Sequence, residues 1–312
     1  MDERGERSAG ATGPYDGADR MDAATEAFVA HRNLLFTVAY EMLGSATDAE
    51  DVLQESWLRW ADVDLDAVRE RRAYLVRIVT RMSLDRLRAL GRRKESYVGP
   101  WLPEPLLTTP DVAEDVELAD SVSMAMLLVL ETLQPTERAV FVLREVFGLE
   151  YEEISEAVGK SLAAVRQIAY RARAHVAARR PRGVASPAET RTALQAFQRA
   201  VETGDLQDLL DILAPDVVAL SDGGGVKHAL LRPVVGAGNV ARLLAVGWWR
   251  RDAERSVELV QINGGPGLLV RVDGKVDGVV AVRLEDGYVT GAYHVRNPEK
   301  LSRVERETPV SR

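Results

Sequence analysis

Residues 149–182 constrain the fold of this chain more than any other stretch, because they combine two short helical patterns with a glycine break between them. Gly159 interrupts the first pattern, and Ser161 is a good N-cap for a second helix. The apolar residues are Tyr151, Ile154 and Val158 in the first helix and Val165, Ile168, Ala169, Ala172 and Val176 in the second. The spacing predicts a helix–turn–helix whose second helix packs through one face only.

The opposite face of that second helix is slim and basic. Seven Lys or Arg and no acid lie between Lys160 and Arg182. Such a helix can enter the DNA major groove, where Gln and Arg reach base edges and nearby Arg contact phosphates. The candidate contact residues are Ala163, Arg166, Gln167, Tyr170, Arg171 and Arg173. A helical hairpin with a solvated basic face is the alternative, but the glycine turn, the cap and the absence of acid favour DNA.

The chain has 312 residues, a length that predicts two or three domains. It has no cysteine, which excludes disulfides, thiolate zinc sites and cysteine nucleophiles and favours a reducing cytoplasm. The four histidines have no metal-ligand spacing, so we expect neither a metal nor a cofactor. No apolar run is long enough to span a bilayer, and the N-terminus lacks a signal-peptide core. We therefore expect a cytoplasmic protein without membrane contact.

Charge is sorted into blocks along the chain, although the net charge is −8. Residues 1–20 are polar and small and predict a disordered leader. Between Glu41 and Asp66 eight acids accompany a single arginine. A predicted helix in this segment carries Asp51, Gln54 and Glu55 on its outer face. A solvated acidic face is the simpler interpretation, and a docking surface for a basic partner protein is the alternative.

The charge reverses in residues 66–94, which carry ten Lys or Arg and three acids. Arg77, Arg81 and Arg88 lie opposite the predicted core stripe, and a line of guanidinium groups can follow a nucleic-acid backbone. Tyr74, with Trp60 before it, can stack on an unpaired base. Core packing is the better interpretation of Trp60 and an equally good one of Tyr74.

A proline-rich segment at 96–110 separates the first helical part from a second. Its four prolines exclude a helix and favour an extended path. Trp101 within it needs cover, so we expect the segment to lie on another part of the protein. Residues 116–147 then predict two helices, the second beginning near Pro135.

The last third of the chain changes character near residue 188. Three helical patterns are combined with strand-like runs at 216–221, 257–261, 268–272, 279–284 and 288–295. Asn-Gly, Asp-Gly and Gly-Gly turn signals separate several of these runs. The pattern predicts an α+β domain with a curved antiparallel sheet, followed by a polar tail at 304–312.

Three stretches resemble the conserved helical domains of an extracytoplasmic-function (group IV) RNA polymerase sigma factor, in the family's order, over about residues 21–182. They are DAEDVLQESWLRW, RAYLVRIVTRMSLDRLRAL and LEYEEISEAVGKSLAAVRQIAYRARAHV. The last third resembles a cone-shaped SnoaL-like domain of the nuclear-transport-factor-like class. WLPEP at 101–105, DGGGVK at 222–227 and NPEKL at 297–301 are similar to the motifs of the sigma J-like subgroup. Glu299 is a small departure from the commoner aspartate.

The resemblance implies a multi-domain protein with two all-α sigma domains followed by an α+β cone. Its boundaries would be sigma region 2 at 21–95, an acidic Pro-rich linker at 96–115, sigma region 4 at 116–182 and the SnoaL-like domain at 183–303. Such a chain binds core RNA polymerase, through the β′ clamp helices and the β flap, and directs initiation at specific promoters. The linker would pass through the polymerase cleft.

The resemblance also implies residue roles. Polymerase binding would involve Asp48, Glu50, Asp51, Gln54 and Glu55, and the minus-ten promoter element would contact Tyr74, Arg77, Arg81 and Arg88. The helix that starts at Ser161 would read the minus-thirty-five element through Ser161 and the six residues named above. The cone would act as a built-in regulator, without a separate anti-sigma factor, through Trp101, Pro103, Glu104, Asp222, Gly223, Gly224, Gly225, Lys227, Asn297, Pro298 and Lys300.

Two other functions stay open at this point. One is a one-component helix–turn–helix regulator with a ligand-binding cone. The other is an enzyme, because this fold class also builds cyclases and isomerases, and Asp222 with His228 or Tyr293 with His294 can supply an acid–base pair. A lone strand histidine is more often structural, so we expect no catalysis and keep a small-ligand pocket as the stronger alternative.

Overall fold

The computed structural model describes residues 14–109, 112, 115–179, 186–203, 205–247 and 254–312. The first helical unit comprises α1 (Pro14–Leu43), α2 (Ala46–Ala61), the short η1 (Leu65–Ala67) and α3 (Arg71–Glu95). Because α1 begins at Pro14, residues 14–20 are helical, which corrects the expectation of a disordered leader there; residues 1–13 lie outside the described residues. Gly44 ends α1 with φ of 67°, a conformation that glycine adopts without strain.

The second helical unit contains the predicted helix–turn–helix. Its elements are α4 (Val116–Val122), α5 (Met124–Leu130), α6 (Pro135–Phe141), the π-helical η3 (Val142–Val146), α7 (Tyr151–Val158) and α8 (Leu162–Ala177). Residues 116–147 form more segments than the two helices expected, because Ser123 ends α4 and its side chain caps α5. Gly159 ends α7 with φ of 66°, and the Ser161 hydroxyl accepts a hydrogen bond from the Ala164 amide at the start of α8.

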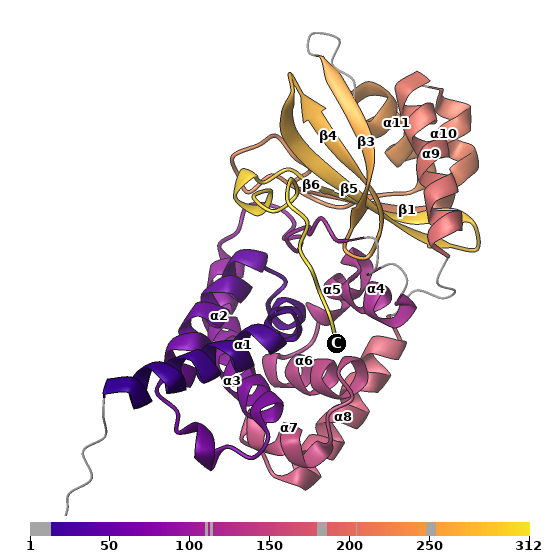
Figure 1. Cartoon of the computed structure of the whole chain (residues 1–312). Helices are drawn as coiled ribbons and strands as arrows, with labels where there is room; N and C mark the ends of the chain where they lie inside the picture. Colours follow the sequence, from indigo (N-terminus) through magenta and orange to yellow (C-terminus); the bar gives the residue numbers. More distant parts are fainter. Residues whose placement is uncertain (1–13, 110–111, 113–114, 180–185, 204, 248–253) are drawn as a thin grey trace, which may run out of the picture.

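The third unit is an α+β cone, as the sequence predicts. Its helices are α9 (Pro187–Thr203), α10 (Leu206–Ile212) and α11 (Ala237–Gly247), and its strands are β1 (Leu213–Asp222), β2 (Val234–Val235), β3 (Arg255–Ile262), β4 (Gly265–Val272), β5 (Lys275–Glu285) and β6 (Tyr288–Val295). The sheet order is β2-β1-β6-β5-β4-β3, and the three helices cover one face of the sheet (Figure 1). The expectation of a purely antiparallel sheet is wrong at one pair, because β1 runs parallel to β6.

The two helical units share one core. The buried cluster contains Leu35 and Val79 of the first unit together with Leu127 and Ile154 of the second. Buried polar groups also join the units, since the Ser121 hydroxyl donates to the Glu41 carboxylate at 2.8 Å and the Arg138 Nε donates to the Glu41 carbonyl at 2.8 Å. Burial raises the pKa of Glu41 to about 8.

The C-terminal segment is not a free polar tail, which corrects the expectation for 304–312. After η4 (Pro298–Lys300) it descends from the cone onto the helical units (Figure 1). Val304 and Val310 are buried, and Val310 belongs to the shared helical core. The Thr308 amide donates to Leu107 in the linker, and the Ser311 amide donates to Thr37 on α1. Apolar residues at six-residue spacing thus hold the segment in place where its charge suggested solvent. Within the described residues no helix is long and apolar enough to cross a bilayer.

Replacing Glu41 with glutamine should stabilise the protein at alkaline pH and have little effect at acidic pH. The folded pKa of Glu41, about 8, lies above its ordinary value of 4.5. The wild-type protein therefore loses stability as the pH rises from the lower value to the higher one, whereas glutamine does not ionise. Glutamine also keeps the acceptor for Ser121. Thermal unfolding at pH 8.5 should give Glu41→Gln a Tm higher by a few degrees, at about 2–4 °C per kcal/mol. Equal Tm differences at pH 5 and pH 8.5, or the same behaviour in the exposed control Glu26→Gln, would contradict this assignment.

Candidate nucleic-acid interface and interdomain cluster

The outward face of α8 is open to solvent. All seven residues predicted to contact the upstream promoter element are exposed, namely Ser161, Ala163, Arg166, Gln167, Tyr170, Arg171 and Arg173. The ion pairs from Arg166 to Glu152 and from Arg171 to Glu137 are long, at 3.8 and 3.9 Å, so they constrain the guanidinium groups little. The face that the sequence assigns to the major groove is therefore available in this structure.

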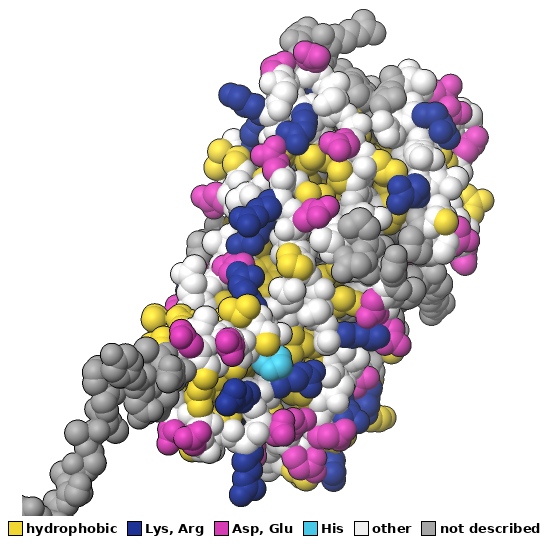
Figure 2. Space-filling view, viewed as in Figure 1, with side chains coloured by type: hydrophobic (Ala, Val, Ile, Leu, Met, Phe, Trp, Pro, Cys, Tyr) yellow, Lys and Arg dark blue, Asp and Glu magenta, His cyan; other side chains and the backbone are white. Residues whose placement is uncertain are grey.

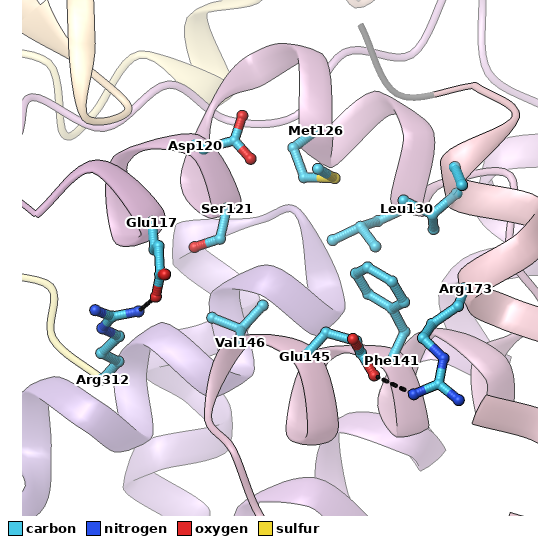
Figure 3. A pocket seen from close by; sticks show the side chains of 12 residues that line it. Glu117, Asp120, Ser121, Met126, Leu130, Phe141, Glu145, Val146, Arg173 and Arg312 are labelled. Carbon is cyan, nitrogen blue, oxygen red and sulfur yellow. Dashed lines mark hydrogen bonds and ion pairs between the residues drawn. The ribbon is translucent and has the colours of Figure 1, made fainter. Parts of the chain in front are cut away.

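Arg173 lies at the rim of a hollow beside α8. Figure 3 shows this pocket of about 450 Å³ between α4, α5, η3 and α8. Arg173 pairs there with Glu145 at 3.3 Å, and Arg312 of the C-terminal segment pairs with Glu117 at the other side. The end of the chain thus reaches the helix–turn–helix unit.

The arginines predicted to bind the downstream element are held by α7. The Arg81 Nη2 donates to the Glu156 carbonyl at 2.8 Å and its Nε to the Ala157 carbonyl at 3.4 Å. Arg77 pairs with the Glu156 carboxylate at 3.1 Å. These carbonyls belong to the last turn of α7, where unpaired C=O groups attract cations. Arg88 is exposed and pairs only locally, with Asp85.

Tyr74 is half-buried between two partners. Its ring centroid lies 5.8 Å from that of Trp60, and the Arg77 guanidinium carbon lies 4.6 Å above it. Trp60 is a core residue, as the sequence favoured, and its indole N–H donates to the Ala24 carbonyl at 2.8 Å. Tyr74 is therefore partly exposed and lies between the core residue Trp60 and Arg77.

The acidic face of α2 is smaller than the sequence predicts. Asp48 is buried and pairs with Arg86 of α3 at 2.7 Å, and Asp51 shares the same guanidinium, with its side chain 47% exposed. Glu50 is 15% exposed and pairs with Arg32 and with Arg303 of the C-terminal segment. Asp48 is therefore not available to a partner protein, because α3 turns Arg86 toward α2. The exposed part of the face consists of Gln54, Glu55 and Leu58.

The three motifs that resemble the sigma J-like subgroup meet in one buried cluster. The Lys300 ammonium donates to the Asp222 carboxylate and to the Leu102 carbonyl, both at 2.7 Å, and lies 3.3 Å from the Trp101 ring centroid. Asp222 also accepts from the Leu102 amide at 2.9 Å and from the Tyr97 hydroxyl. Burial lowers the pKa of Lys300, and the Asp222 charge opposes that shift. We call Tyr97, Trp101, Asp222 and Lys300 the interdomain lock.

Glu104 fixes the linker to the first helical unit. Its carboxylate accepts from the amides of Ala46 and Thr47 and from the Ser45 hydroxyl, at 2.7–3.1 Å. This carboxylate therefore caps the N-terminus of α2 from another part of the chain. Burial raises the pKa of Glu104, and these hydrogen bonds oppose the rise. Pro103 is also buried, so the linker lies on the protein as its tryptophan suggested.

The glycine loop after β1 permits close approach of backbones. A Cβ on Gly224 would lie 2.4 Å from Asn297, and Gly224 and Gly225 have positive φ. Gly225 faces Val98 at the start of the linker. Lys227 does not join the interdomain lock, because it pairs with Asp277 inside the cone at 3.1 Å. Pro298 is exposed, while Asn297 is buried and donates to the Tyr97 hydroxyl at 2.9 Å.

Asn263 is an interdomain residue that the sequence revealed only as part of a turn signal. It lies at the tip of the β3–β4 hairpin with φ of 53° and is buried. Its amide donates to the Tyr40 hydroxyl of α1 at 2.6 Å and to the Val122 carbonyl of α4 at 2.9 Å, and its oxygen accepts from the linker amide of Leu106. The hairpin tip thus contacts both helical units and the linker at once.

Neither acid–base pair suggested by the sequence is formed. Asp222 belongs to the interdomain lock, whereas His228 is exposed at the edge of the cone cavity. Tyr293 packs with Leu102 outside the cone, while its neighbour His294 lines the cavity, because adjacent strand residues point to opposite faces. Among the described residues no group of three or more His, Asp or Glu could hold a metal ion.

The molecular surface shows no single large charged field from the side drawn. Figure 2 shows Lys and Arg interspersed with Asp and Glu over both the cone and the helical units.

Comparison with known proteins identifies both helical units. Residues 16–93 match the Sigma-70 region 2 family and residues 123–176 match Sigma-70, region 4. The chain is 34% identical to the ECF RNA polymerase sigma factor SigJ of Mycobacterium tuberculosis, over 88% of this chain and 92% of that protein. It is 32% identical to the probable ECF RNA polymerase sigma factor SigI of the same species, over 92% and 97% of the two chains.

The architecture of the whole chain is similar to a solved structure as well. The crystal structure of M. tuberculosis SigJ covers 89% of this chain and 98% of its own, with a TM-score of 0.72 and 31% identity. The expected combination of two sigma domains and an α+β cone is thereby confirmed. The chain belongs to the extracytoplasmic-function sigma factors, the alternative RNA polymerase subunits that direct promoter-specific initiation of transcription.

Proposed function

We propose that this sigma factor binds promoter DNA through two helix faces, one exposed and one paired with α7 in this structure. The exposed face of α8 would read the minus-thirty-five element, and Arg77, Arg81 and Arg88 of α3, with Tyr74, would bind the minus-ten element. The supporting observation is that both helices bury one side and carry arginines on the other, exposed on α8 and paired with the end of α7 for Arg77 and Arg81 of α3. Sigma factors are not enzymes, and we propose no catalytic role for this chain.

Core polymerase would dock on the exposed part of α2. Gln54, Glu55 and Leu58 form an outward strip with Asp51 beside it, which suits a basic helical partner such as the β′ clamp helices. The second helical unit would contact the β flap, and the complex would act in the cytoplasm. Glu50 would join this surface only after Arg303 has left it, because their ion pair occupies the carboxylate.

We infer that this arrangement is a closed form, in which the cone and the C-terminal segment hold the two helical units together. The observation that carries this proposal is the pairing of Arg81 with the carbonyls of α7, because those N–H groups cannot donate to α7 and to a phosphate at once. A phosphate could bind these N–H groups only after α7 has left α3. The interdomain lock and Asn263 stabilise the closed form within one chain, so no separate anti-sigma factor is required.

Replacing Glu55 with arginine should weaken binding to core polymerase at least tenfold, because it places a cation against a basic partner surface. The side chain is exposed, so the fold should be unaffected and the Tm unchanged. Binding of labelled full-length protein to core polymerase would measure the effect, with the exposed Glu258→Arg on the cone as the matched control. Equal affinities of the two variants would remove α2 from the docking surface.

Replacing Gln167 with alanine should weaken recognition of the upstream element by about 1–3 kcal/mol, the usual value of a good base contact. The comparison is made on the polymerase complex, between a cognate promoter and one with a substituted minus-thirty-five element. The exposed Arg191→Ala on α9 is the control, because it changes charge far from α8. A discrimination ratio equal to that of the wild type would show that Gln167 does not read a base.

Breaking the interdomain lock should raise the activity of the full chain. In the double variant Asp222→Asn, Lys300→Met both charges are removed, so no unpaired charge stays buried, while the attraction that holds linker and cone together is lost. Run-off transcription with core polymerase should increase several-fold. The exposed Lys275→Met should leave it unchanged. An unaltered or lower yield from the folded double variant would contradict a closed, restrained state.

A further inference from the structure

The cone contains a cavity that promoter recognition does not use. It has a volume of about 330 Å³, at the lower end of the range for small-molecule sites. Its inner wall is apolar and includes Phe197 of α9, Leu244 of α11 and Val270 of β4. Its polar lining is concentrated in Ser221, Arg255, Asp277, His294 and Arg296, with His228 at the edge. An apolar chamber with polar groups gathered on part of its wall is the usual form of a site for an amphipathic small molecule.

The charges of that polar part favour an anionic group. The lining residues bring two guanidinium groups, those of Arg255 and Arg296, and a single carboxylate, that of Asp277. Burial alone would raise the pKa of Asp277, but the hydrogen bond from Lys227 and the charge of Arg296 hold it below its usual range. Burial lowers the pKa of His294 to about 3, so its ring is neutral. The lining therefore carries one net positive charge.

The wall between this cavity and the interdomain lock is one strand thick. On β1, Ser221 lines the cavity and the next residue, Asp222, binds Lys300 on the other side. On β6, His294 lines the cavity, whereas Tyr293 and Val295 pack against the linker residue Leu102. Because side chains alternate between the two faces of a strand, the ends of β1 and β6 line the cavity on one face and contact the linker or the lock on the other.

Arg296 connects the cavity to the interdomain lock through its side chain and its backbone. Its guanidinium pairs with Asp277 at 2.7 Å and lines the cavity, while its backbone amide donates to the Asp222 carbonyl at 2.7 Å. The Asn297 amide donates to the same carbonyl at 2.9 Å. A ligand group that contacts Arg296 therefore contacts a residue whose backbone fixes the lock aspartate.

We propose that the cone cavity binds a small apolar carboxylic acid and that this ligand stabilises the closed form of the sigma factor. The apolar body lies against Phe197, Leu244 and Val270, and the carboxylate accepts hydrogen bonds from Arg255 and Arg296. The lock preorganises the cavity wall, because it holds the ends of β1 and β6 in place. By reciprocity, a ligand that binds this preorganised wall favours the locked state. This second part rests on the proposed closed form.

The binding step is tested on the full chain by isothermal titration calorimetry with octanoate, decanoate and 2-naphthoate. At least one acid should bind with a submillimolar Kd, and the corresponding alcohol should bind at least tenfold more weakly. Arg255→Leu should weaken binding of the acid but not of the alcohol, whereas the exposed Arg242→Leu on α11 should change neither affinity. Ala292→Phe, which narrows the cavity, should abolish binding of both. Failure of all three acids, or equal binding of acid and alcohol, would overturn the proposal.

The coupling step is tested with the same acid and the lock variant Asp222→Asn, Lys300→Met. Its affinity for the acid should fall at least fivefold, and saturating acid should lower the affinity of the wild-type chain for core polymerase by a similar factor. Equal acid affinities in the two proteins would overturn the coupling. The calorimetry needs no polymerase, so ligand binding can be established even if the closed-form proposal fails. The two failures can therefore be told apart.

Discussion

A buried ammonium–carboxylate pair holds together three segments that are distant in the sequence. Lys300 and Asp222 are almost fully excluded from solvent, an arrangement that is costly unless every polar group has a partner. The partners are supplied by the linker, through the Leu102 backbone and the Tyr97 hydroxyl, and the Trp101 ring covers the ammonium. A cone without this linker, or a linker without this cone, would leave a charge or an amide unpaired. The pair therefore specifies one arrangement of the domains more than it adds stability.

The proposed closed form treats the two proposed DNA-binding faces unequally. The α8 face that we propose reads DNA is exposed, whereas Arg77 and Arg81 of α3 pair with the end of α7. In this proposal it is sufficient to restrain one face, because both promoter elements must be bound at once. The C-terminal segment adds a second restraint, since Arg303 pairs with Glu50 beside the proposed polymerase surface. In this proposal one chain carries both the DNA-binding helices and the groups that restrain them.

Periodicity and capping predicted the elements well but said little about their partners. The Gly159 turn, the Ser161 cap and the strand runs of the cone all lie where the sequence places them, because these are local effects. The resemblance assigned Asp48 to polymerase binding, and nothing local in the sequence shows that Arg86 reaches it from α3. The sequence indicated only a hairpin turn at Asn263, because its contacts with Tyr40 and Val122 depend on domain docking. The burial of Val310 could not be predicted from its polar segment for the same reason. The roles of the exposed residues in binding polymerase and DNA stay predictions.

The hairpin contact of Asn263 has a consequence for how the protein is made. Tyr40 and Asn263 are separated by 223 positions, and the last strand and Lys300 come later still. A ribosome adds about 5–20 residues per second, so the helical units leave it on the order of ten seconds before the cone is finished. If the cone restrains the helical units as proposed, each nascent molecule is unrestrained during that interval. Slow translation of the final third would lengthen this unrestrained period, and a pause there would leave newly made chains competent before they close.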